Sequence, residues 1–206
     1  MEAPKIMVTT IILAGGKSSR MGQDKALITI QGVPLLQRIA TIAQECTSQV
    51  YIITPWIERY QSLIPADCHL ILEKIRGEGP LVGFFQALTQ VKTDWVLLLA
   101  CDLPNLTQFE LERWLKSLRN VSKNAIAFLP RNSQGWEPLS GFYRYNCLDS
   151  LERFIKSGGR SFQKWLTQEL VEELIVSDPQ ILFNCNTPED WQMINNSSII
   201  FRFDIN

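Results

Sequence analysis

The amino-acid sequence predicts a three-layer α/β fold with a mostly parallel central sheet. Short apolar runs rich in β-branched residues alternate along the chain with helical patterns, and such alternation is typical of parallel sheets with helices on both faces. The runs are almost continuously apolar, as expected for strands covered on both sides. Ligands of these folds bind beyond the carboxyl ends of the strands, so the loops that follow the strands form the candidate site.

Five runs have the length and composition of buried strands: Ile6–Leu13, Val50–Thr54, His69–Leu72, Trp95–Ala100 and Ala125–Leu129. Helices are expected at Pro34–Gln44, from Gly79-Pro80 onward, after Thr107, at Cys147–Ser157 and from Thr187-Pro188 onward. Thr107 and Glu110 have the spacing of a capping box, and Gly158 suits a C-terminal cap. Most helix ends therefore carry a local signal.

Length and composition restrict the class of protein. The 206 residues fit one domain over residues 1–206. The 20 basic and 21 acidic residues give a net charge of −1 and form no basic block, which argues against nucleic acid or an acidic membrane as a partner. No apolar run approaches the roughly 18 residues of a membrane span. The 5 cysteines are widely spaced without a CxxC pair, so neither a zinc site nor a disulfide framework is expected, and the cytoplasm is the expected location.

The loop after the first strand is rich in glycine and in cationic side chains, reading LAGGKSSRMGQDK from Leu13 to Lys25. Glycines let the backbone approach a ligand closely, and Lys17, Arg20 and Lys25 can neutralise phosphates, each pair being worth about 4 kcal/mol before desolvation. The glycine spacing fits neither the Walker nor the Rossmann phosphate motif. The alternative is a flexible turn with solvated charges.

A single acid follows the strongest strand pattern. Trp95–Ala100 is continued by Cys101-Asp102-Leu103-Pro104, which places Asp102 at the carboxyl edge of the sheet beside the first loop. One carboxylate together with phosphate oxygens is a common way to hold Mg²⁺, and the metal would neutralise an α-phosphate. The alternative is that Asp102 caps the turn before Pro104, while Cys101 is interpreted as a packing residue.

The segment LAGGKSSRMGQDKAL resembles the signature LAGG-x-S-x-RMG-x-DK-x-L of the molybdenum cofactor guanylyltransferase family at every fixed position, and Cys101–Pro104 matches that family's CD-x-P motif. The resemblance covers residues 6–191. It implies a Rossmann-like nucleotidyltransferase fold with a nucleotide half over about residues 1–105 and a pterin-side half over about residues 106–206. The implied reaction transfers GMP from GTP to the terminal phosphate of molybdenum-loaded molybdopterin and releases pyrophosphate.

The resemblance also assigns nucleotide-binding residues. It implies base contacts for Leu13, Ala14 and Gly15, and triphosphate and catalytic contacts for Lys25. Gly16 is expected to bind the nucleotide as well, and Asp102 to bind it together with Mg²⁺ and to take part in catalysis. Arg20 is expected at the nucleotide or the pterin phosphate as a further catalytic residue. Glu73 stands where the family usually has an aspartate that contacts the nucleotide. Related cytidylyltransferases carry AAG where this chain has Ala14-Gly15-Gly16, which favours guanine.

Four residues are expected on the pterin side. Gly79, in a stretch resembling GPL-x-G, begins a helix and offers free N–H groups to an anion, or simply joins a strand to a helix. Arg160, in a GRS…WL segment, binds the pterin phosphate or follows a helix cap as a solvated cation. Asn184 and Asn186, in an N-x-N-T-P element, lie on one side if the segment is a strand and can both donate and accept; the alternative for Asn186 is to cap the last helix.

Two further features of the sequence are less specific. Ser140-Gly141, in a stretch resembling PL-x-x-LY, replaces a usually bulkier pair, so the shape of the pocket there stays open. His69, the one histidine, lies in a predicted strand and is interpreted as structural.

The expected cofactor is Mg²⁺, and the expected substrates are GTP and molybdenum-loaded molybdopterin. Transient contact with molybdenum insertion or acceptor proteins is expected, and contact with nucleic acid or a membrane is not. One rival is a sister nucleotidyltransferase that uses CTP or a sugar phosphate. The other is a non-catalytic nucleotide-binding or adaptor protein, which we would expect to have lost Lys25 or Asp102; both are present.

Overall fold

The computed structural model describes residues 6–15 and 24–196. In this part of the chain the main sheet has the strand order β11-β7-β10-β6-β1-β4-β5, and all its pairings are parallel except those of β10 with β6 and β7. Its strands are β1 (Val8–Leu13), β4 (Gln49–Thr54), β5 (His69–Leu72), β6 (Trp95–Ala100), β7 (Ala127–Leu129), β10 (Ser140–Arg144) and β11 (Val171–Glu173). The predicted mostly parallel sheet is confirmed.

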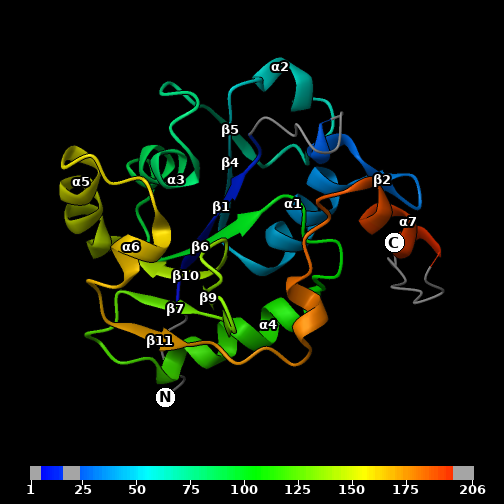
Figure 1. Ribbon diagram of the computed structural model, residues 1–206. Helices are drawn as coiled ribbons and strands as arrows, with labels where there is room; N and C mark the ends of the chain where they lie inside the picture. The colour runs from blue at the N-terminus through cyan, green and yellow to red at the C-terminus, as the bar shows by residue number, and fades with distance from the viewer. Residues whose placement is uncertain (1–5, 16–23, 197–206) are drawn as a thin grey trace.

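Helices cover both faces of the sheet, which confirms the three layers (Figure 1). One face carries α1 (Leu35–Cys46) and α4 (Gln108–Ser117), and the other carries α3 (Pro80–Leu88), α5 (Leu148–Lys156) and α6 (Phe162–Leu166). Ile11 and Ile12 belong to the two different core clusters, because successive side chains of a strand point to opposite faces. This two-sided burial explains why the strands read as continuous apolar runs.

Short elements complete the described chain. They are α2 (Ile57–Tyr60), α7 (Pro188–Asn196), the 3₁₀ turns η1 (Lys25–Leu27), η2 (Leu118–Asn120), η3 (Tyr145–Cys147) and η4 (Pro179–Leu182), and two ribbons, β2 (Thr29–Ile30) with β3 (Val33–Pro34) and β8 (Arg131–Asn132) with β9 (Gly135–Trp136). Within the described ranges, no helix has both the length and the apolar composition that crossing a membrane requires.

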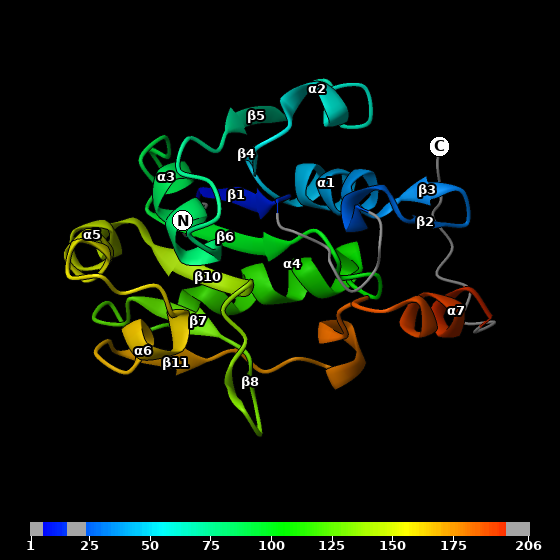
Figure 2. The same cartoon turned by 45° about the horizontal axis from the view of Figure 1, so that its top comes forward.

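The last part of the chain returns to the region of the first loop. After β11 the described part of the chain passes α4, forms η4 and reaches α7, which lies beside the β2–β3 ribbon (Figure 2). There the indole Nε1 of Trp191 donates to the carbonyl of Thr29 over 3.0 Å, and Cys185 is buried with Ile28 and Leu35. Residues far apart in the sequence therefore meet at this end of the molecule.

Helix ends agree only in part with their sequence signals. The Oγ of Thr107 accepts from the N–H of Glu110 over 3.2 Å, but the Glu110 carboxylate turns toward Arg113 and Ser177, so half of the expected capping box forms. Gly158 has a φ of +91° and donates to the carbonyl of Ile155, which confirms it as a cap. These short-range signals hold where no distant partner competes for the side chain.

In the main sheet, β10 is the strand that disrupts the parallel pattern. Steric contacts explain why position 141 in this strand is a glycine. A Cβ on Gly141 would lie 2.7 Å from the carbonyl oxygen of Phe128 and 2.8 Å from Cδ2 of Leu129. Ser140 beside it is buried. The close packing of β10 on β7 therefore requires the glycine at position 141.

Gly141→Ala is expected to lower the free energy of unfolding by about 1–3 kcal/mol, because the added methyl group meets backbone atoms that cannot move away. Gly83→Ala is the matched control, since a Cβ there would lie 3.7 Å from its nearest neighbour and alanine favours a helix. Urea unfolding of both variants measures the difference. Equal stability of the two variants would contradict the steric explanation.

Candidate active site

The carboxyl ends of four parallel strands form one edge of the sheet. Ala14 and Gly15 follow β1, Glu73 follows β5, and Asp102 follows β6. Backbone hydrogen bonds extend the pairing beyond the strands, because the N–H of Ala14 donates to Ile53 over 3.0 Å and that of Glu73 donates to Thr54 over 2.8 Å. The residues predicted to bind the nucleotide are thus collected at one edge, except Gly16 and Arg20, which lie outside the described residues together with Lys17.

Lys25 connects this edge to the end of the chain. Its Nζ lies 3.1 Å from Oδ2 of Asp102 and also donates to Oδ1 of Asn186. The side chains of Lys25 and Asp102 are only 21% and 14% exposed, so solvent screens their attraction less than that of a surface pair. Sequence reasoning placed Lys25 and Asp102 together, whereas the contact with Asn186 had no local signal.

The turn that carries Lys25 is fixed by Asp24. The Asp24 carboxylate accepts from the N–H of Ala26 over 3.2 Å, from the Tyr60 hydroxyl over 2.6 Å and from Nη1 of Arg59 over 2.9 Å. Tyr60 is fully buried, and burial, followed by the hydrogen bond to Asp24, raises the pKa of its hydroxyl. Neither Tyr60 nor Arg59 was found from the sequence, because each acts on a residue about 35 positions away.

The side chain of Glu73 lies against two glycines. A Cβ on Gly15 would be 3.2 Å from Oε2 of Glu73 and 2.9 Å from Cδ of Pro55, while one on Gly83 would be 3.7 Å from Oε1. Burial raises the pKa of the Glu73 carboxyl above its ordinary value of 4.5, and Arg76 opposes this rise. The glutamate therefore fits without displacing the glycine-lined end of β1, and Gly15 leaves the room that it needs.

The amide residues differ from their prediction. Residues 183–187 do not form a strand, so the expected strand face shared by Asn184 and Asn186 is wrong. Asn184 donates to the carbonyl of Leu182 over 3.1 Å. Asn186 does not cap the last helix with its side chain; Thr187 and Asp190 exchange those hydrogen bonds. The Asn186 side chain is left at Lys25.

Arg160 caps α5 and is joined to the start of α3. Its Nη1 donates to the carbonyl of Ile155 over 3.0 Å and its Nε lies 2.6 Å from Oε2 of Glu78, so the alternative of a solvated cation after the helix cap is wrong. Glu78 precedes Gly79, whose φ of +91° suits glycine. Arg160 and Gly79 are thus brought to the same region, and their binding of a pterin stays a prediction.

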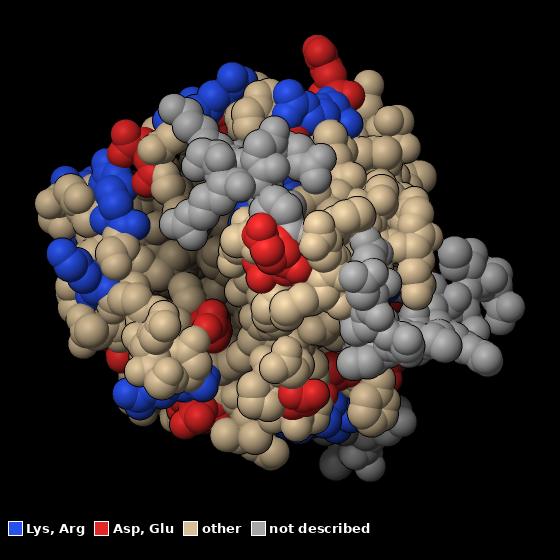
Figure 3. Space-filling view, turned by 45° about the vertical axis from the view of Figure 1, so that its right-hand side comes forward, with Lys and Arg blue, Asp and Glu red and all other residues tan. Residues whose placement is uncertain are grey.

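The donor set suits a cation that is completed by its ligand. Within the described ranges, no three His, Cys, Asp or Glu side chains come together as a metal site. Asp102 instead offers a hard carboxylate oxygen at the sheet edge, which fits Mg²⁺ held mainly by phosphate oxygens and water. Figure 3 shows that the surface on this side is hollowed, with acidic and basic side chains around the hollow.

Tyr60→Phe is expected to lower the free energy of unfolding by about 1.5–3 kcal/mol, because it removes a buried hydrogen bond to a charged carboxylate. Arg59→Gln is the companion variant; it removes a donor to the same oxygen, but the Arg59 side chain is 44% exposed, so its loss should be smaller. Denaturant unfolding ranks the two variants. A larger effect for Arg59→Gln would contradict the role given to the buried hydroxyl.

The sequence and the fold both resemble those of known proteins. Residues 10–173 match the family model described as a MobA-like NTP transferase domain. A probable molybdenum cofactor guanylyltransferase of Nostoc sp. is 56% identical over 91% of this chain and 90% of its own length. A molybdenum cofactor guanylyltransferase of Pseudomonas putida is 33% identical over 87% and 93%.

A solved structure shows the same fold. The molybdopterin-guanine dinucleotide biosynthesis protein A of Archaeoglobus fulgidus superposes with a TM-score of 0.75 and 23% identity over 91% of this chain and 96% of that one. The family match and the alignments with the curated relatives each cover most of the chain, and the family match includes the strand ends described above. The chain therefore belongs to the molybdenum cofactor guanylyltransferase family, within the MobA-like nucleotidyltransferases.

Proposed function

We propose that this protein transfers GMP from GTP to the terminal phosphate of molybdopterin, which already carries molybdenum, with Mg²⁺ as cofactor. The observation that carries the proposal is the contact of Lys25 with Asp102 beside the glycine-lined end of β1. A cation and a carboxylate side by side suit a triphosphate and its metal, because the ammonium group can bind the phosphates and the carboxylate can bind the metal ion. The names of the curated relatives point to the same reaction.

The chemistry needs no nucleophile from the protein. An ionised oxygen of the acceptor phosphate attacks the α-phosphorus of GTP, the bond from that phosphorus to the β-phosphate oxygen breaks, and pyrophosphate leaves with the electron pair. Lys25 stabilises the charge that grows on the leaving group. Asp102 would hold Mg²⁺, which when bound neutralises and orients the phosphates. Arg20 keeps its predicted role at one of the phosphates.

The acceptor is proposed to bind on the side of Asn186. The Asn186 amide contacts Lys25, so an acceptor held by this amide would present its phosphate next to the cation that also serves GTP. Asn184, Gly79 and Arg160 are the further residues proposed for the pterin. Catalysis then consists of holding two anions in line and neutralising their charge.

Asp102→Asn is expected to reduce pyrophosphate release from GTP, Mg²⁺ and molybdopterin by about 10²–10³-fold, the usual effect of losing one stabilising group of this kind. Asp94→Asn, at the opposite end of β6, is the control and should keep wild-type activity. Thermal unfolding shows that both variants are folded. Wild-type turnover by Asp102→Asn would refute the metal assignment, and no release by folded wild-type protein would favour a non-catalytic adaptor.

Glu73 is proposed to select guanine, because a carboxylate can accept from two N–H donors at once. Glu73→Gln is expected to reduce the thermal shift given by GTP with Mg²⁺ and to leave the small shift given by CTP unchanged. The pKa of Glu73 is raised, so GTP binding should be complete above that pKa and weaken as the pH falls through it, at a pH above 4.5. A wild-type shift with CTP alone would overturn the assignment of guanine.

A further inference from the structure

A strap, defined here as residues 174–186, leads from β11 to the candidate site along α4 and the loop after β6 (Figure 1). As the residue number rises along the strap, the number of the contacted residue falls from Glu110 to Asp102. Ser177 binds Glu110, the carbonyl of Gln180 accepts from Nδ2 of Asn105 over 2.9 Å, and the N–H of Cys185 donates to the carbonyl of Asp102 over 3.1 Å. The next residue of the strap is Asn186, which reaches Lys25.

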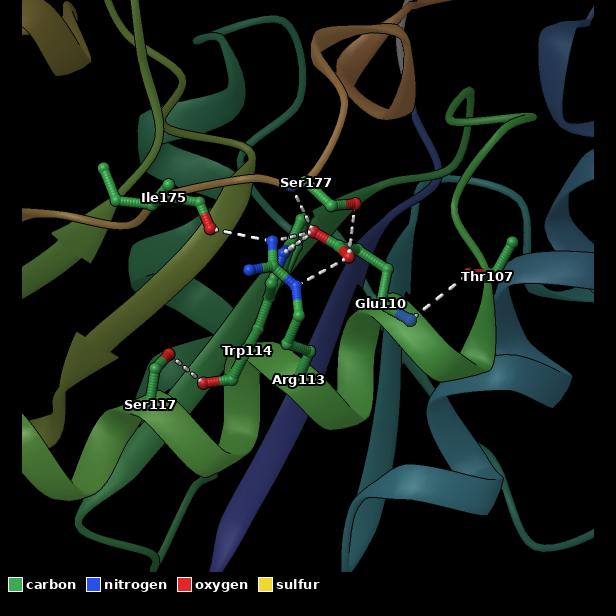
Figure 4. Close-up of polar contacts among 7 residues, drawn as sticks. All are labelled: Thr107, Glu110, Arg113, Trp114, Ser117, Ile175 and Ser177. Atoms are coloured by element: carbon green, nitrogen blue, oxygen red, sulfur yellow. Dashed lines mark hydrogen bonds and ion pairs between the residues drawn. The ribbon is translucent and has the colours of Figure 1, made fainter.

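Glu110 is the anchor at the far end of the strap. Its carboxylate is buried and accepts from five donor groups, drawn in Figure 4. Arg113 donates through Nη2 over 2.6 Å and Nε over 2.9 Å, and Trp114 donates through Nε1 over 2.7 Å. Ser177 adds its N–H over 3.0 Å and its Oγ over 2.8 Å. Only the bonds from Ser177 link the strap to this carboxylate.

The charge of Glu110 makes the anchor strong. Burial by itself would raise the pKa of this carboxyl, but the hydrogen bonds from Arg113, Ser177 and Trp114 outweigh it and lower the pKa to about 2. Hydrogen bonds to an ionised acceptor are shorter and stronger than neutral ones. Arg113 also donates to the carbonyl of Ile175 over 2.9 Å, so the strap is held on both sides of residue 176.

The link between the anchor and Asn186 is itself constrained. The Asp178 carboxylate accepts from the N–H of Gln180 over 2.8 Å, which caps the 3₁₀ turn η4. Ile181 within this turn is buried in the core shared with α4. A displacement at Ser177 is therefore passed along the strap instead of being absorbed by a loose loop.

We propose that the Ser177–Glu110 contact is a positioning element for the acceptor substrate, setting the Asn186 amide against Lys25 and Asp102. The inference rests on the proposed function, because it names the residues that position the acceptor at the same site. The nucleotide side is also held by elements outside the strap. Gly15 and Glu73 belong to other strand ends, and Asp24 with Tyr60 fixes the turn of Lys25. Loss of the contact should thus affect the acceptor and spare GTP.

Ser177→Ala is the test, because it removes one hydrogen bond to the carboxylate and leaves Arg113 and Trp114 in place. We expect the KM for molybdopterin to rise about fivefold, the effect of roughly 1 kcal/mol, while the KM for GTP and kcat stay within about twofold. Ser177→Thr keeps the hydroxyl and should restore the KM. Glu110→Gln should give the same pattern with a larger rise.

One control variant and one further measurement separate a positioning role from a general loss of structure. Ser117→Ala removes a hydrogen bond to the carbonyl of Trp114 on the same helix without touching the strap, and should leave every kinetic constant unchanged. Hydrogen–deuterium exchange gives a readout without activity: the Cys185 amide, which binds the carbonyl of Asp102, should exchange faster in Ser177→Ala than in wild type.

The outcomes also separate this inference from the proposed function. An equal rise of both KM values, or unchanged exchange at Cys185, would overturn the role of the strap. Wild-type protein that is folded and releases no pyrophosphate would refute the proposed function. In that case, exchange at Cys185 would still decide whether Ser177 controls the position of the strap.

Discussion

The candidate site is organised around the contacts that the ammonium group of Lys25 makes with two other side chains. The ammonium group lies between the carboxylate of Asp102 and the amide of Asn186, and these groups come from the first loop, the end of β6 and the C-terminal segment. Each partner is fixed by separate means. Asp24 and Tyr60 hold the turn of Lys25, and the buried strand β6 carries Asp102. The strap that leads to Asn186 is bonded to Glu110 on α4 and to the carbonyl of Asp102.

Such a half-buried pair contributes little to stability, because desolvation of both charges offsets much of their attraction. The hydrophobic core is sufficient to stabilise the fold, so the Lys25–Asp102 pair is better explained by a role in binding or catalysis than by a role in stability. Lys25 in the turn η1 and Asp102 at the end of β6 place two opposite charges in a fixed orientation beside each other. In the proposed reaction, bound phosphates and a cation would replace the internal pairing, and groups that are already oriented lower the cost of reorganisation.

The sequence predicted what depends on short-range patterns. Trp95–Ala100 was found with its observed bounds because a run covered on both faces is continuously apolar. His69–Leu72 was also found with its observed bounds, although this edge strand is only partly buried. Asp102 was placed at the sheet edge because it directly follows such a run. β10 was missed, since Ser140-Gly141 interrupts its apolar pattern and no local signal gives its antiparallel direction. The contact of Asn186 with Lys25 and the hydrogen bond from Tyr60 to Asp24 depend on tertiary packing. The spacing of residues along the sequence does not encode such contacts.

The reversed direction of β10 has an electrostatic consequence for the proposed acceptor side. Because β10 starts at the edge where β6 ends, α5 runs back toward that edge and presents its carboxyl terminus there, while the neighbouring α3 presents its amino terminus. The two helix macrodipoles then oppose each other, and the partial negative charge at the end of α5 would repel an anionic group. Arg160 lies at that terminus and donates to Ile155, so this guanidinium compensates a field that the topology of one strand creates.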